Sequence, residues 1–352
     1  MPDPGDSGAG ASPGDRPQRR ATSYDVARLA GVSQSAVSRV FKPGASASAA
    51  MRRRVMDAAN RVGYRPNAIA RGLITQRSNM VGVVISKLVN LNYPEVLVEI
   101  TQRLSGRGIR VLLFALETEG DTAAALDQVV QYRVDGVITA AMLTGEQLGM
   151  LDEAQIPVVF YNRAPDVPAV NAVRCDHAAG ERWLVGELVD SGHRRFSIIA
   201  GPEDSPVSTE RTLGAVEELE RLGVADVTVA RGDYGYGSGR EGFATIVEEL
   251  GSPPDAVIAA NDTMAIGCID EARAMFGLEV PGDMSVVGFD GVGPSAYAAY
   301  RLTTVAQPVA QMSEAAVSML TERIENPELP KEQRVFSGIP IRGNSARLAN
   351  NS

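Results

Sequence analysis

Eight short apolar runs recur between residues 80 and 290, and segments of helical period separate them. The runs read MVGVVIS, IRVLLFAL, DGVITAA, IPVVFYN, FSIIAG, VTVA, DAVIAAN and MSVVGFD. Amphipathic segments such as residues 178–191 and 209–222 are long enough to be helices. This alternation predicts an α/β fold with parallel sheets covered by helices on both faces. So many strands favour two doubly wound lobes over a single sheet.

Charge is divided unevenly along the 352 residues, whose formal net charge is −9. Residues 16–73 contain twelve Lys or Arg against only Asp25 and Asp57. Residues 74–352 contain 22 Lys or Arg against 38 Asp or Glu. A basic head on an acidic body indicates that only the head contacts a polyanion.

The head has the pattern of three short helices. A first helix begins near Thr22 and is ended by Gly31, and Ser33 is a suitable N-cap for a second helix. A third helix is expected at residues 49–62. Two short helices joined by a glycine turn predict a helix-turn-helix.

Polar side chains recur on the outer face of the second helix, while Val37 and Val40 face inward. Gln can bond adenine and Arg can bond guanine through two hydrogen bonds in the major groove. Residues Arg52–Arg54 of the third helix are expected near phosphates. The candidates for DNA contact are Gln34, Ser35, Ser38, Arg39 and Arg53.

The segment GYRPNAIARGL, residues 63–73, follows the head. It could form a helix that starts at Pro66, but it is too short and too glycine-containing to be stable alone. A helix that forms only when docked can act as a switch. The apolar side chain of Leu73 could wedge between base steps in the minor groove. Asn67 and Arg71 are further candidates for DNA contact.

Polar residues stand where the core strands end. Ligands of doubly wound sheets bind beyond the carboxyl ends of the strands. Amide, guanidinium and carboxylate groups beside an aromatic ring suit hydroxyls or ring nitrogens. We expect a sugar or sugar derivative, with a nucleoside or another small metabolite as the alternative. The effector-binding candidates are Tyr93, Asn162, Arg163, Arg211, Asn261 and Asp290, and Asp262 is expected only to cap a helix.

Three segments together resemble one known family. DVARLAGVSQSAVSRVF, GYRPNAIARGL and RSNMVGVVI look like the DNA-binding head, hinge helix and first core strand of the LacI/GalR family of bacterial regulators. The resemblance extends over almost all of the chain after Ala21. It implies base contacts by Gln34, Ser35 and Arg39, and intercalation by Leu73. It also implies a homodimeric transcriptional regulator, usually a repressor, that binds pseudo-palindromic double-stranded operator DNA.

The same resemblance extends to the body. SPVSTERTLG, AANDTMAIG and VVGFDG resemble segments that line the effector cleft of a periplasmic-binding-protein-like core. This implies that Arg211, Asn261 and Asp290 contact a small-molecule effector, together with Asn162 and Tyr93. Asn162 stands where Asp is frequent in the family, and Gly291 replaces the second Asp of a common FDD. These departures leave the class of effector open, as well as whether it releases or strengthens DNA binding.

The expected organisation has four parts. Residues 1–20 form a disordered tail without the apolar segment of a secretory signal peptide. The chain ends without leucine heptads, so a dimer is expected rather than a tetramer. The parts are the tail, a helix-turn-helix domain at 21–64, a hinge helix and linker at 65–78, and a two-lobed core at 79–346. The first lobe comprises 79–174 and 306–333, and the second comprises 175–305 and 334–346.

Two other classes of protein share parts of this pattern. A solute-binding protein for transport would have the same body, but the head and the missing signal peptide disfavour it. An NAD-binding enzyme is suggested by GSGREG, residues 237–242, with Asp262 about twenty residues further on. The five or so residues between the strand VTVA and Gly237 disfavour it, because that fingerprint needs a tight turn directly after a strand.

The histidines, cysteines and apolar runs indicate neither catalysis nor a membrane segment. His177 has no partners at metal-ligand spacing, and His193 follows Gly192 at a helix stop, where a solvated or capping role is expected. Cys175 and Cys268 form no disulfide framework. No apolar run reaches the ~20 residues that span a bilayer. We therefore expect a cytoplasmic protein that is not an enzyme and has no cofactor, no catalytic residue and no metal site.

Overall fold

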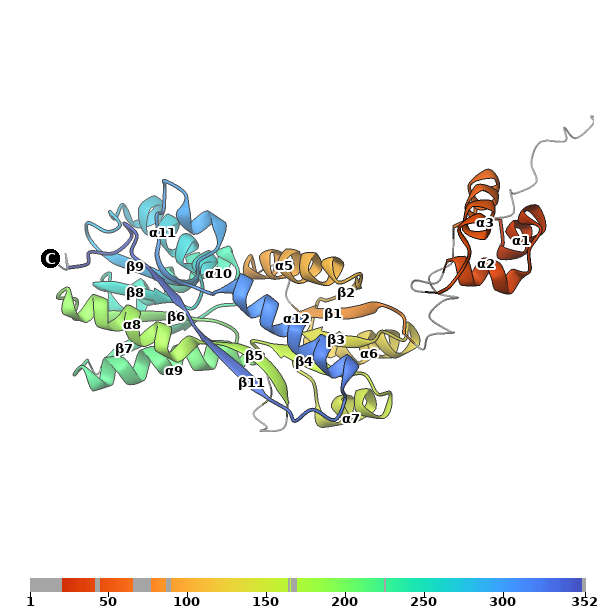
Figure 1. Ribbon diagram of the computed structural model, residues 1–352. Coiled ribbons are helices and arrows are strands. Elements are labelled where there is room, and N and C mark those ends of the chain that lie inside the picture. The colour runs from red at the N-terminus through yellow and green to blue at the C-terminus, as the bar shows by residue number, and fades with distance from the viewer. Residues whose placement is uncertain are drawn as a thin grey trace, which may run out of the picture. The chain divides into compact units, whose positions relative to one another are not determined.

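The computed structural model describes residues 21–41, 45–65, 77–86, 90–163, 165, 170–224 and 226–349. These fall into two units, one ending at Ser78 and one beginning at Asn79 (Figure 1). The tail and most of the predicted hinge lie outside the described residues. The predictions for Asn67, Arg71 and Leu73 therefore stay predictions.

The first unit is the expected helix-turn-helix with a third helix packed against it. Its helices are α1 (Ser23–Ala30), α2 (Gln34–Val40) and α3 (Ala49–Val62). The Ser33 hydroxyl accepts a hydrogen bond from the amide of Ala36 at 3.2 Å, which begins α2 as predicted. Gly31 ends α1 with φ of 62°, a conformation that glycine adopts without strain. Three fully buried valines, Val26, Val37 and Val55, join the helices at the centre.

The second unit contains two six-stranded sheets, and the first of them is parallel throughout. Its strand order is β11-β5-β4-β3-β1-β2. Helices α5 (Asn92–Gly106) and α12 (Val309–Glu325) cover one face, and α6 (Thr122–Gln131) and α7 (Gly145–Glu153) cover the other. The strands are β1 (Met80–Ser86), β2 (Arg110–Leu116), β3 (Gly136–Thr139), β4 (Val158–Tyr161), β5 (Asn171–Asp176) and β11 (Gln333–Ser337).

The second sheet has the order β12-β10-β9-β8-β6-β7, and only β12 runs antiparallel to its neighbour. Helices α8 (His177–Asp190) and α9 (Pro206–Arg221) cover one face, and α10 (Tyr236–Leu250) and α11 (Asp262–Phe276) cover the other. The strands are β6 (Phe196–Ala200), β7 (Val227–Arg231), β8 (Ala256–Ala259), β9 (Ser285–Asp290), β10 (Thr303–Ala306) and β12 (Ile339–Ile341).

The apolar alternation of the strands divides the core by face. Val81, Val83 and Ile85 of β1 join a central cluster that continues into the second lobe, whereas Val84 joins the cluster beneath α6 and α7. Successive strand residues point to opposite faces, so one strand contributes to both clusters. One apolar cluster therefore spans both lobes, while each lobe has a further cluster of its own on the other face of its sheet.

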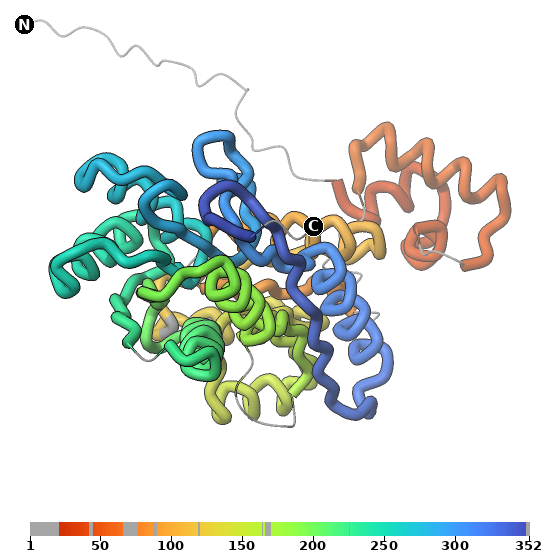
Figure 2. The backbone as a smooth tube through the Cα atoms, turned by 90° about the vertical axis from the view of Figure 1, so that its left-hand side faces the viewer, coloured from red at the N-terminus to blue at the C-terminus, as the bar shows by residue number. Residues whose placement is uncertain are grey.

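The chain passes between the lobes three times, after Asp176, at Gln307 and at Gly338. These crossings lie close together, and in Figure 2 the last of them is the dark blue tube. A Cβ on Gly338 would lie 2.3 Å from Val305 Cγ1 and 3.8 Å from Cys175 Sγ, so the last crossing requires glycine.

The crossings correct the predicted lobe boundaries. Strands β5 and β11 pair over their whole length in the first sheet. Residues 175–176 and 334–337 therefore lie in the first lobe and not, as expected, in the second. The alternation in QRVFS indicates a strand, but the sheet that this strand joins depends on neighbours far away in the sequence.

All eight predicted strands are present as β1–β4 and β6–β9. The prediction omitted β5, β10, β11 and β12, none of which contains a long apolar run. Strands β11 and β12 lie at sheet edges, where one side of the strand meets solvent, so Val335 and Ile339 are at least half exposed. Edge strands lack the long apolar runs by which buried strands are recognised.

His193 has the capping role that the helix stop indicates, but it is not solvated. Its ring is buried, with Nδ1 2.8 Å from the carbonyl oxygen of Leu188 and Nε2 2.8 Å from the hydroxyl of Ser285. Burial lowers the pKa of His193. The ring therefore joins the end of α8 to the start of β9.

The central glycine of GSGREG, Gly239, serves the packing of α10 on α11. A Cβ on Gly239 would lie 2.2 Å from the carbonyl oxygen of Met264, and one on Gly267 would lie 2.2 Å from that of Tyr236. The backbones of α10 and α11 approach too closely for any side chain at these two positions. This contact accounts for the motif without a bound nucleotide.

Candidate functional site

The four polar candidates of α2 share one exposed face of the head. Their side chains are all exposed, whereas Ala36, Val37 and Val40 on the opposite side are buried. The amide of Gln34 lies 3.4 Å from the hydroxyl of Ser23, which brings the start of α1 beside this face. The structure therefore brings together Gln34, Ser35, Ser38 and Arg39.

The three consecutive arginines of α3, Arg52–Arg54, are all exposed. Arg52 in addition donates to the carbonyl oxygen of Val40 at 3.2 Å. Arg52 thus caps the end of α2, a role that the sequence did not indicate. Tyr24, 70% exposed on α1, is a further candidate that the sequence analysis omitted. The sequence could have shown this, because Tyr24 does not share the helical spacing of the inward-facing residues Val26 and Ala30.

The strand-end candidates of the core form a continuous hydrogen-bonded chain across the two lobes. The amide of Asn162, just after β4, donates to Gln307 Oε1 at 2.6 Å, and Asn162 Oδ1 accepts from the backbone amide of Cys175 at 2.9 Å. The amide of Gln307 then donates to Asp290 Oδ1 at 2.7 Å. Gln307 lies at a crossing between the lobes, so this chain links the first sheet to the end of β9.

Arg211 of α9 continues the chain and is only 2% exposed. Its Nη2 donates to Asp290 Oδ1 at 2.7 Å, and its Nη1 donates to the carbonyl oxygen of Ala260. The guanidinium carbon lies 3.9 Å from the centre of the Phe289 ring. Burial lowers the pKa of Arg211, but the ion pair with Asp290 outweighs that effect, and the pKa is raised overall.

His177, at the start of α8, is the next member. Arg211 Nε donates to its Nδ1 at 3.2 Å, so the ring proton resides on Nε2. Burial and the charge of Arg211 lower the pKa of His177 well below its usual value. His177 is therefore a neutral acceptor that orients the guanidinium.

A second link between the lobes runs through Arg163. Its guanidinium donates to the hydroxyl of Ser86, at the end of β1, at 2.7 Å, and to the hydroxyl of Ser205 at 3.3 Å. Ser205 is the N-cap of α9 in the second lobe and lies 2.9 Å from the hydroxyl of Tyr234. Arg163 thus joins both lobes to one cluster of hydroxyl groups.

Asn261 has the capping role that the sequence indicated for Asp262. The Asn261 carbonyl accepts from the amide of Met264 at 2.8 Å, so Asn261 is the cap of α11. Asp262 accepts from the amide of Val292 and from the hydroxyl of Thr304, and fastens the loop after β9. Burial raises the pKa of Asp262 to about 8. The prediction that Asp262 is only the helix cap is wrong.

Two strand ends have a backbone conformation that is rare for side-chain-bearing residues. Asn162 has φ of 62° and Asp290 has φ of 111°. Strained residues of this kind gather at functional sites, where the surroundings hold them in place. A Cβ on Gly291 would lie 2.3 Å from Ala306 Cβ, which explains glycine in place of the family's second Asp.

Tyr93 lies in the first turn of α5 and is 8% exposed, with its ring in the central apolar core.

The structure brings three of the predicted site residues, Asn162, Arg211 and Asp290, into one network. Arg163 lies in the second link, and Asn261 caps α11 beside Tyr234. The polar partners that the sequence analysis omitted are Ser86, His177, Ser205, Tyr234 and Gln307. Of these, only Ser86 carried the strand-end signal.

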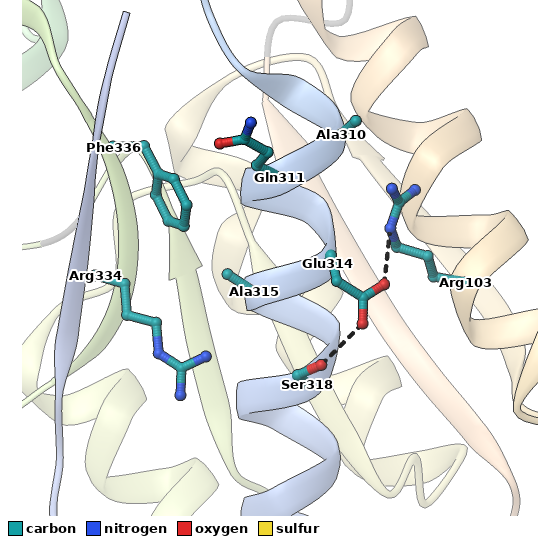
Figure 3. Close-up of a pocket in the computed structure, with 8 residues that line it drawn as sticks. All are labelled: Arg103, Ala310, Gln311, Glu314, Ala315, Ser318, Arg334 and Phe336. Atoms are coloured by element: carbon teal, nitrogen blue, oxygen red, sulfur yellow. Dashed lines mark hydrogen bonds and ion pairs between the residues drawn. The ribbon is translucent and has the colours of Figure 1, made fainter.

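A groove of about 510 Å³ lies elsewhere, along α12 between α5 and β11 (Figure 3). Arg103 and Arg334 flank the helix on opposite sides. Arg103 is paired with Glu314 at 3.0 Å and Arg334 with Glu332 at 2.5 Å, so these cations are neutralised within the protein. The groove shares no residue with the network at the strand ends.

Among the described residues, no group of three or more acidic, histidine or cysteine side chains could hold a metal ion. In the same part of the chain, no helix is long and apolar enough to cross a membrane.

Known proteins resemble both units. A model of bacterial regulatory proteins of the lacI family matches residues 22–67, and a model of a periplasmic binding protein-like domain matches residues 185–346. Catabolite control protein A of Priestia megaterium is 31% identical over 306 residues, which cover 86% of this chain and 92% of that protein.

Solved structures agree over nearly the whole length. The lac repressor dimer bound to operator and the anti-inducer ONPF has a TM-score of 0.85 at 27% identity, covering 94% of this chain and 100% of that one. A complex of the transcriptional regulator CelR with cellobiose has a TM-score of 0.71 at 30% identity, covering 93% and 100%. With its helix-turn-helix head and two-lobed core, the chain belongs to the lacI family of bacterial regulatory proteins, a family of transcriptional regulators rather than enzymes.

Proposed function

We propose that this chain is a transcriptional repressor that binds a specific operator as a homodimer and responds to a sugar or sugar derivative. The observation that carries the proposal is the polar network that joins both lobes at the strand ends, on a chain whose head presents an exposed polar helix face. Two similar structures support it, since one is a dimer on operator DNA and the other contains cellobiose. Operator DNA in a bacterium lies in the cytoplasm, so the function places the chain there.

The head supplies the groups for direct readout. Gln34 and Arg39 would contact base edges from α2, with Ser35 and Ser38 beside them, and Arg53 would contact phosphate. One helix of seven residues reads few base pairs. Two copies on a pseudo-palindromic site double the reading surface and set the half-site spacing.

The cleft chemistry suits a ligand rich in hydroxyl groups. Amides of Asn162 and Gln307 can both donate and accept, and Asp290 and Arg211 supply one acceptor and one donor of strong hydrogen bonds. In the structure these groups form hydrogen bonds with one another. A sugar would bind by replacing protein–protein hydrogen bonds with its own.

Control of DNA binding would follow from the two links between the lobes. Replacing the bonds of Gln307 or Arg163 removes contacts that hold one lobe against the other. An effector changes operator affinity only through its different affinity for the two lobe arrangements. To change the populations of the two lobe arrangements from 1:99 to 99:1, an effector must bind one of them about 10⁴-fold more tightly than the other.

The readout assignment predicts different losses for two arginines. The operator is first selected from a random DNA library with the full chain. The Arg39→Ala variant should then lose discrimination between this operator and its single-base variants. The Arg53→Ala variant should weaken binding to all DNA alike. It should also reduce the slope of log K against log salt concentration by up to about 0.9 per lost phosphate contact. Binding isotherms at several salt concentrations measure both. Equal losses of discrimination in both variants would contradict the assignment.

The effector assignment predicts stabilisation of the full chain by a carbohydrate. Thermal melts with cellobiose, other disaccharides, monosaccharides, nucleosides and NAD should show a shift only with a carbohydrate. A ligand at 100 times its Kd stabilises the folded state by about 2.7 kcal/mol. Adding the same ligand to the operator complex then shows the direction of control. A nucleoside hit would replace the proposed class, and an NAD hit would contradict the packing role of GSGREG.

A further inference from the structure

Glu181 on α8 is a buried acid that the proposed function does not use. The residue is 1% exposed, and neither carboxyl oxygen has a hydrogen-bond partner in the part of the chain that the structure describes. An ionised carboxylate in such surroundings is costly, because burial removes its hydration. The side chain therefore calls for a physical explanation.

Glu181 lies one helical turn after His177, the residue of α8 that contacts Arg211. Gly180, its neighbour, packs on Phe289, since a Cβ there would lie 2.6 Å from a ring carbon. The ring of His177, one turn earlier on α8, lies 5.4 Å from the same phenyl ring, which also carries the guanidinium of Arg211. Residues one turn apart share a face of a helix. Glu181 thus follows the residue that orients Arg211.

No other element separates α8 from α9, which lie side by side in Figures 1 and 2. A Cβ on Gly214 would lie 2.8 Å from the Cα atom of Ala178. His177 Nε2, which carries the ring proton, also has no hydrogen-bond partner among the described residues. Two buried polar groups one turn apart on α8 are therefore unsatisfied, and the first of these residues contacts the buried guanidinium of Arg211.

Two charged groups act on Glu181 from the elements packed around it, Arg211 from α9 and Asp290 from β9. Of the other charged groups of the two helices, Glu187, Glu210, Glu218 and Arg221 are paired elsewhere. Those pairs are Arg174–Glu210, Arg221–Glu218 and Arg342–Glu187. Neither the remaining ones, Arg182, Asp190, Glu217 and Glu220, nor the strands that pack against α8 add a charge that acts on this carboxyl.

Burial and these two charges together set the protonation state of Glu181. Burial raises the pKa of Glu181 to about 8, the charge of Arg211 lowers it, and the charge of Asp290 raises it. While Asp290 neutralises Arg211, the Glu181 carboxyl keeps its proton at neutral pH. Without the charge of Asp290, one raising influence is lost and the attraction of Arg211 remains.

We propose that Glu181 is a reserve counter-ion for Arg211, neutral while Asp290 is paired with the guanidinium and ionised when Asp290 is withdrawn. The ionisation is a simple dissociation in which the carboxyl becomes a carboxylate and its proton leaves to solvent. If Asp290 turns toward an effector, as the proposed function implies, Arg211 is not left as an uncompensated buried charge. Glu181 is then a positioning residue, and effector binding releases a proton.

A double-mutant cycle on the ligand-free full chain tests this coupling. The variants are Glu181→Gln, Asp290→Asn and the two together, compared by urea midpoint at pH 7. Glu181→Gln alone should leave the midpoint unchanged or raise it, because an amide replaces a neutral acid of the same shape. In the Asp290→Asn background it should lower the midpoint, because Arg211 then has no counter-ion. The same shift in both backgrounds would overturn the proposal.

A pH series on the single variant tests it even if Asp290→Asn does not fold. Because the folded state raises the pKa of Glu181, it binds more protons than the unfolded state between the two pKa values. Stability therefore falls as pH rises toward about 8 and is flat above it. Glu181→Gln should make the stability less dependent on pH, by up to about a tenfold change in the unfolding constant per pH unit. The pH dependence that remains would come from Asp262, whose pKa is also raised.

The matched control is Glu217→Gln, an exposed acid on α9, which should change neither the cycle nor the pH slope. An unchanged slope in Glu181→Gln would show that the carboxyl is ionised throughout and would overturn the proposal. No effector enters either experiment. A failed search for an effector would therefore leave this result intact, and a failed cycle would leave the proposed function intact.

Discussion

Replacing Arg211 by methionine should destabilise the folded core by about 3–5 kcal/mol, the usual cost of removing one partner from a buried ion pair. The guanidinium satisfies Asp290, His177 and the carbonyl of Ala260, and methionine satisfies none of them. Among the described residues, Asp290 would then keep only Gln307 as a side-chain donor, and its buried charge would lose the cation paired with it.

Urea denaturation of the full chain at pH 7 measures this loss. The control is Arg231→Met on β7, which removes an exposed arginine and should change the free energy of unfolding by less than about 0.5 kcal/mol. Equal small losses in both variants would show that Arg211 is solvated in solution. If the loss is large, an Arg211 variant that fails to bind effector must also be tested for its folded fraction, because unfolding alone would abolish binding.

Replacing Gly267 by alanine should destabilise the second lobe by about 2–3 kcal/mol, through overpacking of α10 on α11. The new Cβ would lie 2.2 Å from the carbonyl oxygen of Tyr236. Backbone atoms cannot move aside as the end of a side chain can. The two helices would have to separate, and the contact of Gly239 with Met264 would be lost with them.

Gly237→Ala is the matched control on α10, because a Cβ there meets nothing within 4 Å. It should stabilise the chain by about 0.5 kcal/mol, since alanine restricts the unfolded chain more than glycine does. The two glycine variants should therefore change the urea midpoint in opposite directions. A loss of stability in Gly237→Ala as large as that in Gly267→Ala would contradict a packing role for these glycines.

Much of the fold was predictable, because its signals are local. Three head helices followed from caps and helix-ending glycines at Ser33 and Gly31, and eight core strands followed from their apolar runs. The order of those strands and the sheet joined by residues 333–337 required contacts between distant segments. For the same reason Gly338 shows its role only in three dimensions, where it passes between Val305 and Cys175.

The candidate cleft divides in the same way. Parallel strands bring their carboxyl ends to one edge, so Asn162, Arg163 and Asp290 could be named from sequence. Gln307 also follows a strand end, but that strand, β10, was omitted from the prediction, and Ser205 lies before a helix. Their roles appear only when hydrogen bonds to Asn162 and Arg163 join them.

By itself the sequence determined the helix-turn-helix, the α/β class and the strand-end residues, since spacing along the chain decides which side chains share a face or an edge. Only the tertiary structure decided that Arg211 pairs with Asp290, that Asn261 and not Asp262 caps α11, and that Glu181 on α8 is buried. Pairing, burial and protonation depend on distances between segments far apart in the chain, and no local pattern encodes those distances.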